Sequence, residues 1–392
     1  MENNKLIKYE SGLIKRVSDA ISITNKLLGV MESRLIPYRK KDKWGFCTPD
    51  KKVVIDCIYD WVKPFSDGLA IVTLKGKKGF INTTGNVIVP CVYNNAWEFV
   101  EGLARVEMYN KNGSKYGFVD KEGNNVIPCI HVYANDFSEG LACINSFNNG
   151  FGFIDLQGQV LIPCLYGGFT ENFSEGLASV KKLGGKMGFI NKNGDVIIPF
   201  IYDNAHSFSE GLASVDVNGK YGFIDKNGNT VVSYSYNSAS NFKEGISVVR
   251  KASENGYGLV NGIGYINKKG DVIIPCIYEN GSHFSEGLAN VELDRKCGYI
   301  DKDGNTVIPF IYDGSSIQID PDIEYTTGDF SEGLASVGMN QKCGYINKKG
   351  NLVIDLIYDY GSLNPYSKGL AIVKKNDEWG YINKEGEQYW ED

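Results

Sequence analysis

Short apolar runs separated by glycine-containing turns follow one another along the chain from about residue 41 onward. In the run YGFID (221–225), Tyr221, Phe223 and Asp225 fall on one face of an extended chain and the other two residues on the opposite face. The run VIIPFIY (196–202) is apolar throughout, which predicts a strand that is covered on both faces. Its proline has no N–H to donate, so this strand must be bulged or lie at the edge of a sheet.

These runs recur in a fixed order. The sequences F-S-E-G-L-A-x-V, x-Gly-aromatic-Ile-Asp/Asn and V-I-P-x-I-Y-D return about every 37 residues. Self-similarity at this period indicates a repeat architecture. We therefore predict an all-β protein of about ten tandem repeats, each a three-stranded antiparallel β-meander. The ten copies are marked by the glycine before the aromatic residue: Gly45, Gly79, Gly117, Gly152, Gly188, Gly222, Gly264, Gly298, Gly344 and Gly380.

The repeats resemble the WG (also called KWG) β-repeats, a bacterial family named for Trp-Gly at this place. Trp44-Gly45-Phe46 and Trp379-Gly380-Tyr381 match the name directly, whereas interior copies carry other residues before the glycine. The resemblance covers about residues 41 to 392. It implies a repeat scaffold that binds proteins or peptides. It implies no catalytic motif, so no functional residue is carried over.

The order of the runs at the two ends bears on how the repeats are arranged. One repeat cannot bury its own hydrophobic face, so neighbours must complete one another's interior. Propellers usually close at four to eight blades. The first repeat begins at KWGF with no strand before it, and the last repeat supplies none. We expect an open, twisted superhelical ribbon over residues 39–392 as a single repeat domain, with a closed β-propeller-like ring as the alternative.

Residues 1–38 differ in kind from the repeats. Apolar side chains within 10–36 recur at intervals of three or four, which predicts an amphipathic α-helix that ends before Pro37. Two roles remain open for this helix: a cap over the first repeat, or a surface for a partner. The stripe consists of Leu13, Val17, Ile21, Thr24, Leu28, Met31 and Leu35.

Composition removes several classes of function. With 41 Lys and Arg against 47 Asp and Glu, the net charge of −6 gives no basis for binding nucleic acid or an anionic membrane. No apolar stretch reaches the ~18 residues of a membrane span, and the N-terminus lacks the apolar core of a secretory leader. We therefore expect a cytoplasmic protein without membrane insertion.

The nine cysteines predict packed thiols and not metal ligands or disulfide partners. No C-x-x-C pair occurs, and five cysteines share one repeat position that Phe200 and Phe310 also occupy. A position that accepts either residue needs an apolar filler. We expect neither a metal nor another cofactor. The five are Cys57, Cys91, Cys129, Cys164 and Cys276.

No standard catalytic motif is present. The three histidines, His131, His206 and His283, fall in variable stretches and are predicted to be surface loop residues. An acid recurs once per repeat, and a role shared by every repeat is structural: accepting turn N–H groups or pairing with a lysine of the turn INKKG. The sequence thus predicts a protein that is not an enzyme. The recurring acids are Asp67, Glu101, Glu139, Glu175, Glu210, Glu244, Glu286 and Glu332.

A specific binding surface is expected where the repeats differ. The segments before each Phe vary most, for example DWVKPF, NNAWEF, YGGFTENF and DNAHSF. Large side chains there are candidate partner-binding residues: Trp61, Trp97, Phe169 and His206. The acidic insertion 314–328 is a second variable feature. We expect a non-enzymatic scaffold for a protein or peptide partner. The alternative is a carbohydrate-binding module, since Tyr and Trp beside Asn and Asp suit sugars.

Overall fold

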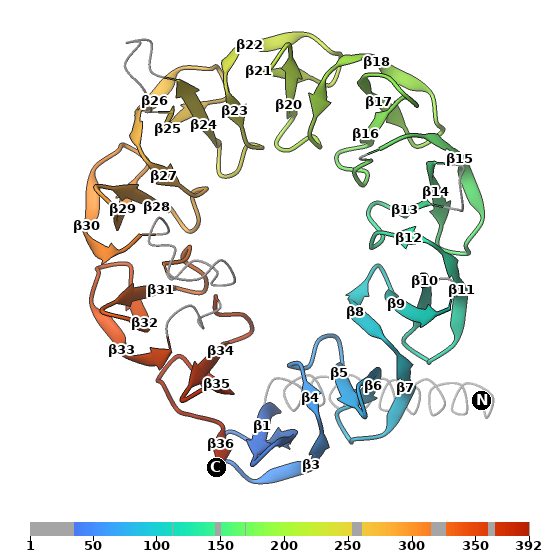
Figure 1. Ribbon diagram of the computed structural model, residues 1–392, viewed down its shortest axis with the longest axis vertical. Coiled ribbons are helices and arrows are strands. Elements are labelled where there is room, and N and C mark those ends of the chain that lie inside the picture. Colours follow the sequence, from blue (N-terminus) through green and yellow to red (C-terminus); the bar gives the residue numbers. More distant parts are fainter. Residues whose placement is uncertain are drawn as a thin grey trace, which may run out of the picture. The chain divides into compact units, whose positions relative to one another are not determined.

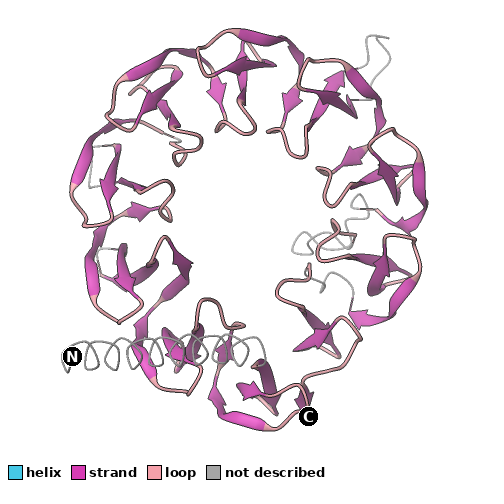
Figure 2. Ribbon diagram, turned by 180° about the vertical axis from the view of Figure 1, so that it is seen from behind, coloured by secondary structure: helices cyan, strands magenta, loops and turns pink. Residues whose placement is uncertain are grey.

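The computed structural model describes residues 35–111, 113–145, 150–168, 170–252, 261–314, 327–359 and 365–391. Phe169, most of the insertion 314–328 and almost all of the predicted N-terminal helix lie outside these ranges. Figure 2 shows strands and loops throughout the described part of the chain. None of its elements is a helix long and apolar enough to cross a membrane. The predicted all-β class is confirmed.

The chain divides into two compact units. Unit 1 contains the described residues up to Glu98 together with Lys121–Gly123 and Tyr389 onward. Unit 2 contains Phe99–Asp120 and Asn124–Gln388. Over both units the described residues form ten small sheets, one for each repeat seen in the sequence. Neighbouring strands within the sheets are antiparallel, with one exception described below.

The strands fall into four classes by their order within a repeat. The first strands are β4 (Trp61–Val62), β8 (Asn95–Val100), β12 (Tyr133–Ala134), β19 (Asn204–Ala205), β23 (Ser238–Ala239) and β27 (Asn280–Gly281). The second strands are β1 (Ile36–Lys40), β5 (Leu69–Leu74), β9 (Leu103–Asn110), β13 (Leu141–Asn145), β16 (Leu177–Lys181), β20 (Leu212–Val217), β24 (Ile246–Ala252), β28 (Leu288–Leu293), β31 (Leu334–Met339) and β34 (Leu370–Lys375). The third strands, which carry the x-Gly-aromatic motif, are β2 (Lys43–Cys47), β6 (Lys77–Asn82), β10 (Gly113–Asp120), β14 (Phe151–Asp155), β17 (Met187–Asn191), β21 (Lys220–Asp225), β25 (Asn261–Asn267), β29 (Lys296–Asp301), β32 (Lys342–Asn347) and β35 (Glu378–Asn383). The fourth strands are β3 (Val53–Tyr59), β7 (Val87–Tyr93), β11 (Asn125–His131), β15 (Val160–Tyr166), β18 (Val196–Tyr202), β22 (Thr230–Tyr236), β26 (Val272–Tyr278), β30 (Thr306–Asp313) and β33 (Leu352–Asp359), and β36 (Trp390–Glu391) ends the chain.

Most sheets have four strands and not the three that the sequence predicts. In six of the seven four-stranded sheets the extra strand is the first strand, which is formed by the variable segment before the Phe. In the sheet β19-β20-β21-β22, Asn204 pairs with Asp216 and Ala205 with Val215. Strands of this class are only two residues long in five of six cases, too short to carry a recognisable pattern. The segments predicted as loops are therefore edge strands.

The two ends of the repeat array are paired, which contradicts an open ribbon. β36 adds to the sheet β3-β2-β1-β36 as the parallel partner of β1. The hydroxyl of Tyr38 donates to the carboxylate of Glu391 at 2.6 Å, and the N–H of Lys41 donates to the carbonyl of Glu391 at 2.9 Å. In Figure 1, β36 lies beside β1. The prediction of an open ribbon was wrong because the chain does have a strand before KWGF, Ile36–Lys40. Pairing of the two ends agrees with the alternative, a closed propeller-like arrangement.

The proline-containing fourth strand is an edge strand, as its sequence predicts. In unit 2 it lies on the outer side of each sheet (Figure 1). The expectation that it is covered on both faces is wrong, however. In β18, Ile198 and Tyr202 are buried, whereas Val196 and Ile201 are 51% and 56% exposed. Only the side chains that point toward the neighbouring sheet enter the core.

The glycine before the aromatic residue is required for close approach of two backbones. A Cβ on Gly188 would lie 2.6 Å from the carbonyl oxygen of Ile198 in the adjacent fourth strand. The pairing register of β17 and β18 shifts at this point, between Met187 and Phe189. The close approach and the predicted bulge are thus one feature, since the glycine admits the extra residues of the fourth strand.

Each hydrophobic core lies between one sheet and the next. One cluster joins Leu177, Phe189 and Ile198 of one repeat to Phe208 and Val215 of the following repeat. Aromatic pairs repeat this contact along unit 2, with ring centroids 4.7 to 5.1 Å apart. Neighbouring repeats therefore complete one another's interior, as the repetition in the sequence predicts.

The recurring acid links consecutive repeats, which confirms its structural role. Glu175 and Gly176 both have positive φ and form a two-residue turn before β16. The Glu175 carboxylate accepts from the N–H of Gly211 in the next turn at 3.1 Å and pairs with Lys226 at 3.0 Å. Both predicted partners are present, a turn N–H and a lysine of the turn equivalent to INKKG, and both come from the next repeat. We call this arrangement the glutamate clamp. Equivalent lysine pairs are Lys192–Glu139, Lys268–Glu210, Lys302–Glu244, Lys348–Glu286 and Lys384–Glu332.

Candidate functional site

The candidate partner-binding residues that the structure describes lie in the first-strand segments, each in a different sheet. Trp61 lies in β4 and packs edge-on against Trp44, with ring centroids 4.8 Å apart. Trp97 lies half-buried in β8. His206 follows β19 in unit 2, and Phe169 lies outside the described residues. Counting back from the recurring Phe of each repeat, Trp61 and Asn204 share one position, and Trp97 and His206 share another.

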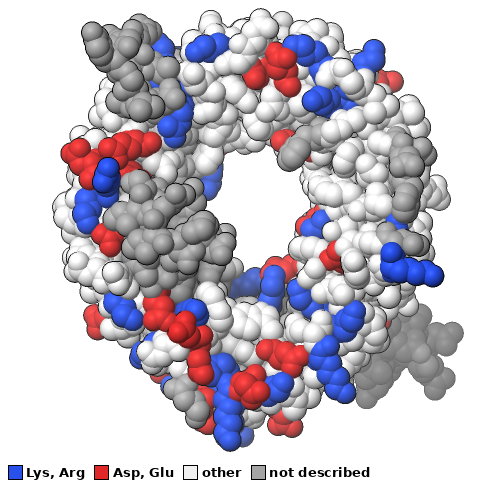
Figure 3. All heavy atoms as spheres, viewed as in Figure 1, with Lys and Arg blue, Asp and Glu red and all other residues white. Residues whose placement is uncertain are grey.

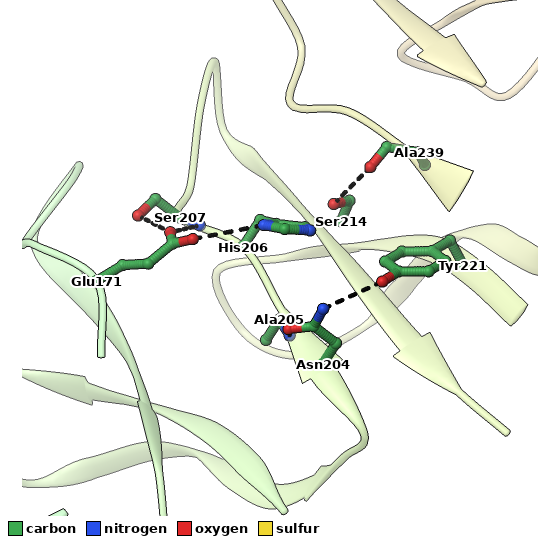
Figure 4. Close-up of polar contacts among 8 residues, drawn as sticks. All are labelled: Glu171, Asn204, Ala205, His206, Ser207, Ser214, Tyr221 and Ala239. Carbon is green, nitrogen blue, oxygen red and sulfur yellow. Dashed lines mark hydrogen bonds and ion pairs between the residues drawn. The ribbon is translucent and has the colours of Figure 1, made fainter. Parts of the chain in front are cut away.

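His206 belongs to a hydrogen-bonded contact between two sheets (Figure 4). Its Nδ1 lies 3.4 Å from the carboxylate of Glu171, which also accepts from the N–H and hydroxyl of Ser207. Burial favours a higher pKa for Glu171, but hydrogen bonds from His206 and Ser207 outweigh it and lower the pKa. The His206 ring also stacks at 6.2 Å on Tyr221. The Glu171 side chain thus fills the space between the sheet β16-β17-β18 and the sheet β19-β20-β21-β22.

One of the other two histidines is not a surface loop residue, contrary to prediction. His131 is the last residue of β11 and is 6% exposed, and burial lowers its pKa, assisted by nearby Lys115. His283 follows β27 and lies outside the strands, as predicted for a loop residue, but it is half-buried, and burial likewise lowers its pKa.

One pocket of about 290 Å³ lies in unit 2, where β28 faces the segment before Phe330. It combines first-strand residues of one repeat with the corresponding segment of the next repeat. We call it the Asn290 pocket. Its lining residues are Asn280, Gly281, Ser282, Asn290, Val291, Glu292, Cys297, Thr327, Gly328 and Asp329.

The lining of the Asn290 pocket is rich in hydrogen-bond acceptors. The Asn290 amide nitrogen donates to the carbonyl of Thr327 at 2.9 Å. Its Oδ1 is buried and accepts no hydrogen bond from the described residues. The carboxylate of Glu292 is buried beside Gly314, and Asp329 contributes a second carboxylate. The ten lining residues include no Lys, Arg or His, so the pocket is acidic.

Small residues keep this pocket open. Gly281 stands where the equivalent residue of other sheets is Ala205 or Ala239. A Cβ on Gly281 would lie 2.8 Å from the hydroxyl of Tyr265, which itself donates to the carbonyl of Ser282 at 2.9 Å. Ser282 occupies the position that Glu171 and His206 fill in their repeats. Sequence reasoning missed the pocket because its signal is a lack of bulk and not a motif.

Among the described residues, no three His, Cys, Asp or Glu side chains are grouped so that they could hold a metal ion. None of the nine cysteines, all of which are described, forms a disulfide. Burial raises the pKa of the Cys143 and Cys47 thiols to about 12, which keeps them protonated and unreactive at neutral pH. Cys297 and Cys343 are buried as well, whereas the five cysteines that share one repeat position are only half-buried on the fourth strands, so the prediction of packed thiols holds for four of the nine.

Charge on the visible surface is mixed. On the face that Figure 3 shows, Lys and Arg lie interspersed with Asp and Glu, in keeping with the net charge of −6. A continuous basic stripe, the usual footprint of a nucleic-acid-binding surface, is not seen on the described part of this face.

The fold and the pocket define a tandem-repeat, β-propeller-like all-β protein with repeat-to-repeat variation concentrated in its first strands. The family comparison agrees. The model of the WG containing repeat matches nine segments: 44–77, 79–111, 116–149, 151–186, 187–221, 221–253, 263–297, 298–316 and 344–379. The chain belongs to the WG-repeat family.

Comparison with solved structures gives only weak similarities. No curated protein matches the chain. The crystal structure of the computationally designed Ika8 protein is similar with a TM-score of 0.40 and 13% identity, over 74% of this chain and 93% of that one. BamB from Moraxella catarrhalis gives 0.39 and 11%, over 74% and 91%. Apo AztD from Citrobacter koseri gives 0.33 and 14%, over 61% and 76%. TM-scores below 0.5 give no basis for transferring a function from these proteins.

Proposed function

We propose that this protein is a non-enzymatic, cytoplasmic interaction scaffold that binds a protein or peptide partner through the first-strand segments of its repeats. The observation that carries the proposal is the Asn290 pocket. It lies between two repeats and is lined by first-strand residues, which differ from repeat to repeat.

The contrast with the rest of each repeat supports this proposal. The glutamate clamp, the glycine of the third strand and the aromatic pairs are repeated with little change, and each has a structural partner. Residues that vary on such a constant framework are available for recognition. Pockets of about 300 Å³ are at the small end of ligand sites, so the Asn290 pocket suits one side chain of a partner.

Carbohydrate binding is the second candidate, and the lining of the pocket favours it in one respect. Ser282, Asn290 and Asp329 offer hydroxyl, amide and carboxylate groups that can bond to sugar hydroxyls. A glycan array probed with wild type and with Trp97→Ala tests this candidate. Glycan binding that is lost in Trp97→Ala would favour the lectin function over the scaffold.

Selection of peptides from a random displayed library on the immobilised full-length protein tests the leading proposal. We expect an enriched consensus whose synthetic peptide binds wild type, with binding weakened at least tenfold by Asn290→Arg, which fills the pocket. Asp195→Asn is the matched control. Asp195 is an exposed turn residue of unit 2 that accepts from Asn191, and Asn stands at its position in other repeats, as at Asn229.

Equal binding of the peptide by wild type and Asn290→Arg would place recognition elsewhere. Failure to enrich any peptide, together with saturable binding of a glycan, would overturn the scaffold function.

A further inference from the structure

Five second strands of unit 2 carry a polar residue directly opposite the aromatic residue of the third strand, and three of these residues bond to the next repeat. Arg105 pairs with Phe118, Ser214 with Phe223 and Asn290 with Tyr299. In each case the side chain donates a hydrogen bond to a backbone carbonyl of the next repeat. These acceptors are equivalent, each three residues before the Phe: Ala134, Ala239 and Thr327. Figure 4 shows the Ser214–Ala239 contact.

In the repeat of Arg105, a guanidinium occupies the space between the two repeats. Its Nε lies 3.0 Å from the carboxylate of Asp136, and its NH1 donates to the carbonyl of Ala134. The guanidinium carbon lies 6.0 Å from the centre of the Tyr116 ring, within the range of a cation–π contact. Glu107, two residues after Arg105, is buried and accepts from the Tyr116 hydroxyl. This space therefore accommodates a guanidinium that pairs with a carboxylate, in a repeat that also buries a second carboxylate.

The Asn290 pocket is the equivalent space in a later repeat. Its hydrogen-bond acceptors are equivalent to those around Arg105, but the side chains that occupy the space are smaller. Glu292 corresponds to Glu107, since each faces the residue before the third-strand glycine. Asp329 corresponds to Asp136, as the residue directly before the Phe. Two side chains are shorter: Asn290 replaces Arg105, and Cys297 replaces Tyr116. Both acids are retained, while the position of Arg105, whose guanidinium pairs with Asp136 in the earlier repeat, is taken by the shorter Asn290.

We propose that the Asn290 pocket binds the guanidinium of an arginine side chain from the partner, which takes the place that Arg105 takes within its own repeat. This inference rests on the proposed scaffold function and specifies what the pocket recognises. The incoming guanidinium pairs with the Asp329 carboxylate and donates to Asn290 Oδ1, which accepts from no described residue. The Thr327 carbonyl retains a lone pair for a second donor.

Arginine fits this geometry better than lysine does. A guanidinium is planar and presents five N–H donors in a fixed fork, so it can bond to several acceptors at once. Arg105 shows this directly, since its Nε and NH1 address a carboxylate and a carbonyl together. An ammonium group offers a compact charge without the matching directions.

Titration of the full-length protein with L-arginine amide tests the assignment without a partner. NMR or calorimetry should show saturable binding, with a dissociation constant of about 1 mM, typical of so small a ligand. Citrulline amide has the same shape without the charge and should bind at least tenfold more weakly, and lysine amide should also bind more weakly. Asp329→Asn should weaken arginine amide binding about tenfold, a change of about 1.4 kcal/mol.

Asn290→Arg should abolish this binding, because its own guanidinium then fills the pocket as Arg105 does. Asp195→Asn removes one negative charge elsewhere in unit 2 and should leave the binding unchanged. If Asn290→Arg fails to fold, Asp329→Asn and the citrulline comparison still decide the question.

Absence of saturable arginine amide binding, equal binding of citrulline or lysine amide, or equal binding by wild type and Asp329→Asn would each overturn the guanidinium assignment. These results leave the scaffold function standing as long as selected peptides still bind. Conversely, arginine amide binding with no enriched peptide would support the pocket chemistry and count against the scaffold function.

Discussion

The turns before the second strands and the short first strands both contact the next repeat, but the contacts of the turns are constant and those of the first strands vary. Each glutamate clamp joins a carboxylate to the N–H and the lysine of the next repeat, and this arrangement recurs with little change. The first strands meet the next repeat with different groups each time: Glu171 with Ser207 in one pair of repeats, and an open pocket in another. The difference teaches that the repeats are held together by their constant parts, while the variable parts form the surface for which we propose recognition of a partner.

The largest effect is expected from a constant position. Gly188→Ala should lower the free energy of unfolding by about 3 kcal/mol, because the new Cβ meets the backbone oxygen of Ile198 at 2.6 Å and neither strand can move away easily. Urea denaturation followed by fluorescence measures the change. The control is Gly185→Ala, whose Cβ makes an ordinary contact of 3.4 Å with Lys182 and should change stability by less than about 0.5 kcal/mol. Equal effects of the two substitutions would remove the special role of the third-strand glycine.

Substitutions at Gly281 and at Tyr265, which lie in consecutive repeats, should have coupled effects on stability. Gly281→Ala should cost about 1–3 kcal/mol, because its Cβ meets the Tyr265 hydroxyl. Tyr265→Phe alone should cost about 1 kcal/mol by removing the bond to the Ser282 carbonyl. In the double variant the clash is absent, as in the natural pair Phe223 and Ala239. A double-mutant cycle by denaturation should therefore give a positive coupling, and strictly additive costs would contradict this account.

Loss of one glutamate clamp should have a moderate effect. Glu175→Gln should lower the free energy of unfolding by about 1–2 kcal/mol, since a charge-assisted bond to Gly211 and the pair with Lys226 are weakened at a partly exposed site. Thermal denaturation of the variant and of Asp195→Asn gives the comparison. A midpoint equal to that of wild type would show that the clamp adds no stability.

The smallest effect is the pH dependence of the same clamp. Burial favours a higher pKa for Glu175, but the bonds from Lys226 and Gly211 outweigh it, so the folded-state pKa lies below the ordinary 4.5. A lowered folded-state pKa means that the stabilisation is complete above about pH 4.5 and is lost as the pH falls through the folded-state value. The difference in stability between wild type and Glu175→Gln should accordingly shrink between about pH 5 and pH 3. A constant difference over this range would exclude ionised Glu175 as its source.

The sequence predicts the constant parts of the molecule well, because each constant residue meets one recurring physical demand. The third-strand glycine, the edge position of the proline strand and both partners of the recurring acid follow from repetition alone. Repetition carries no information about the two ends. The pairing of β1 with β36 was missed because IPYRK and YWED carry none of the repeat motifs.

The first strands and the pocket were missed for a different reason. A strand of two residues, such as Asn280–Gly281, has no detectable period. The pocket results from residues that are small, and smallness matters only when the neighbour across the repeat is known. Gly281 is explained by Tyr265 and Asn290 by comparison with Arg105, and neither relation is visible before the register of the strands is known. The exposure of Val196 and Ile201 likewise depends on which face of an apolar strand meets the next sheet.

The most direct test of the central claim is a pair of binding and stability measurements on two variants with a selected peptide. Glu175→Gln should lower the unfolding midpoint and leave the peptide affinity unchanged, whereas Asn290→Arg should leave the midpoint within a few degrees and reduce the affinity at least tenfold. The account is contradicted if Glu175→Gln weakens peptide binding without loss of stability, or if Asn290→Arg binds the peptide as wild type does. Either result would mean that the constant parts do not serve stability alone or that the variable parts do not bind the partner.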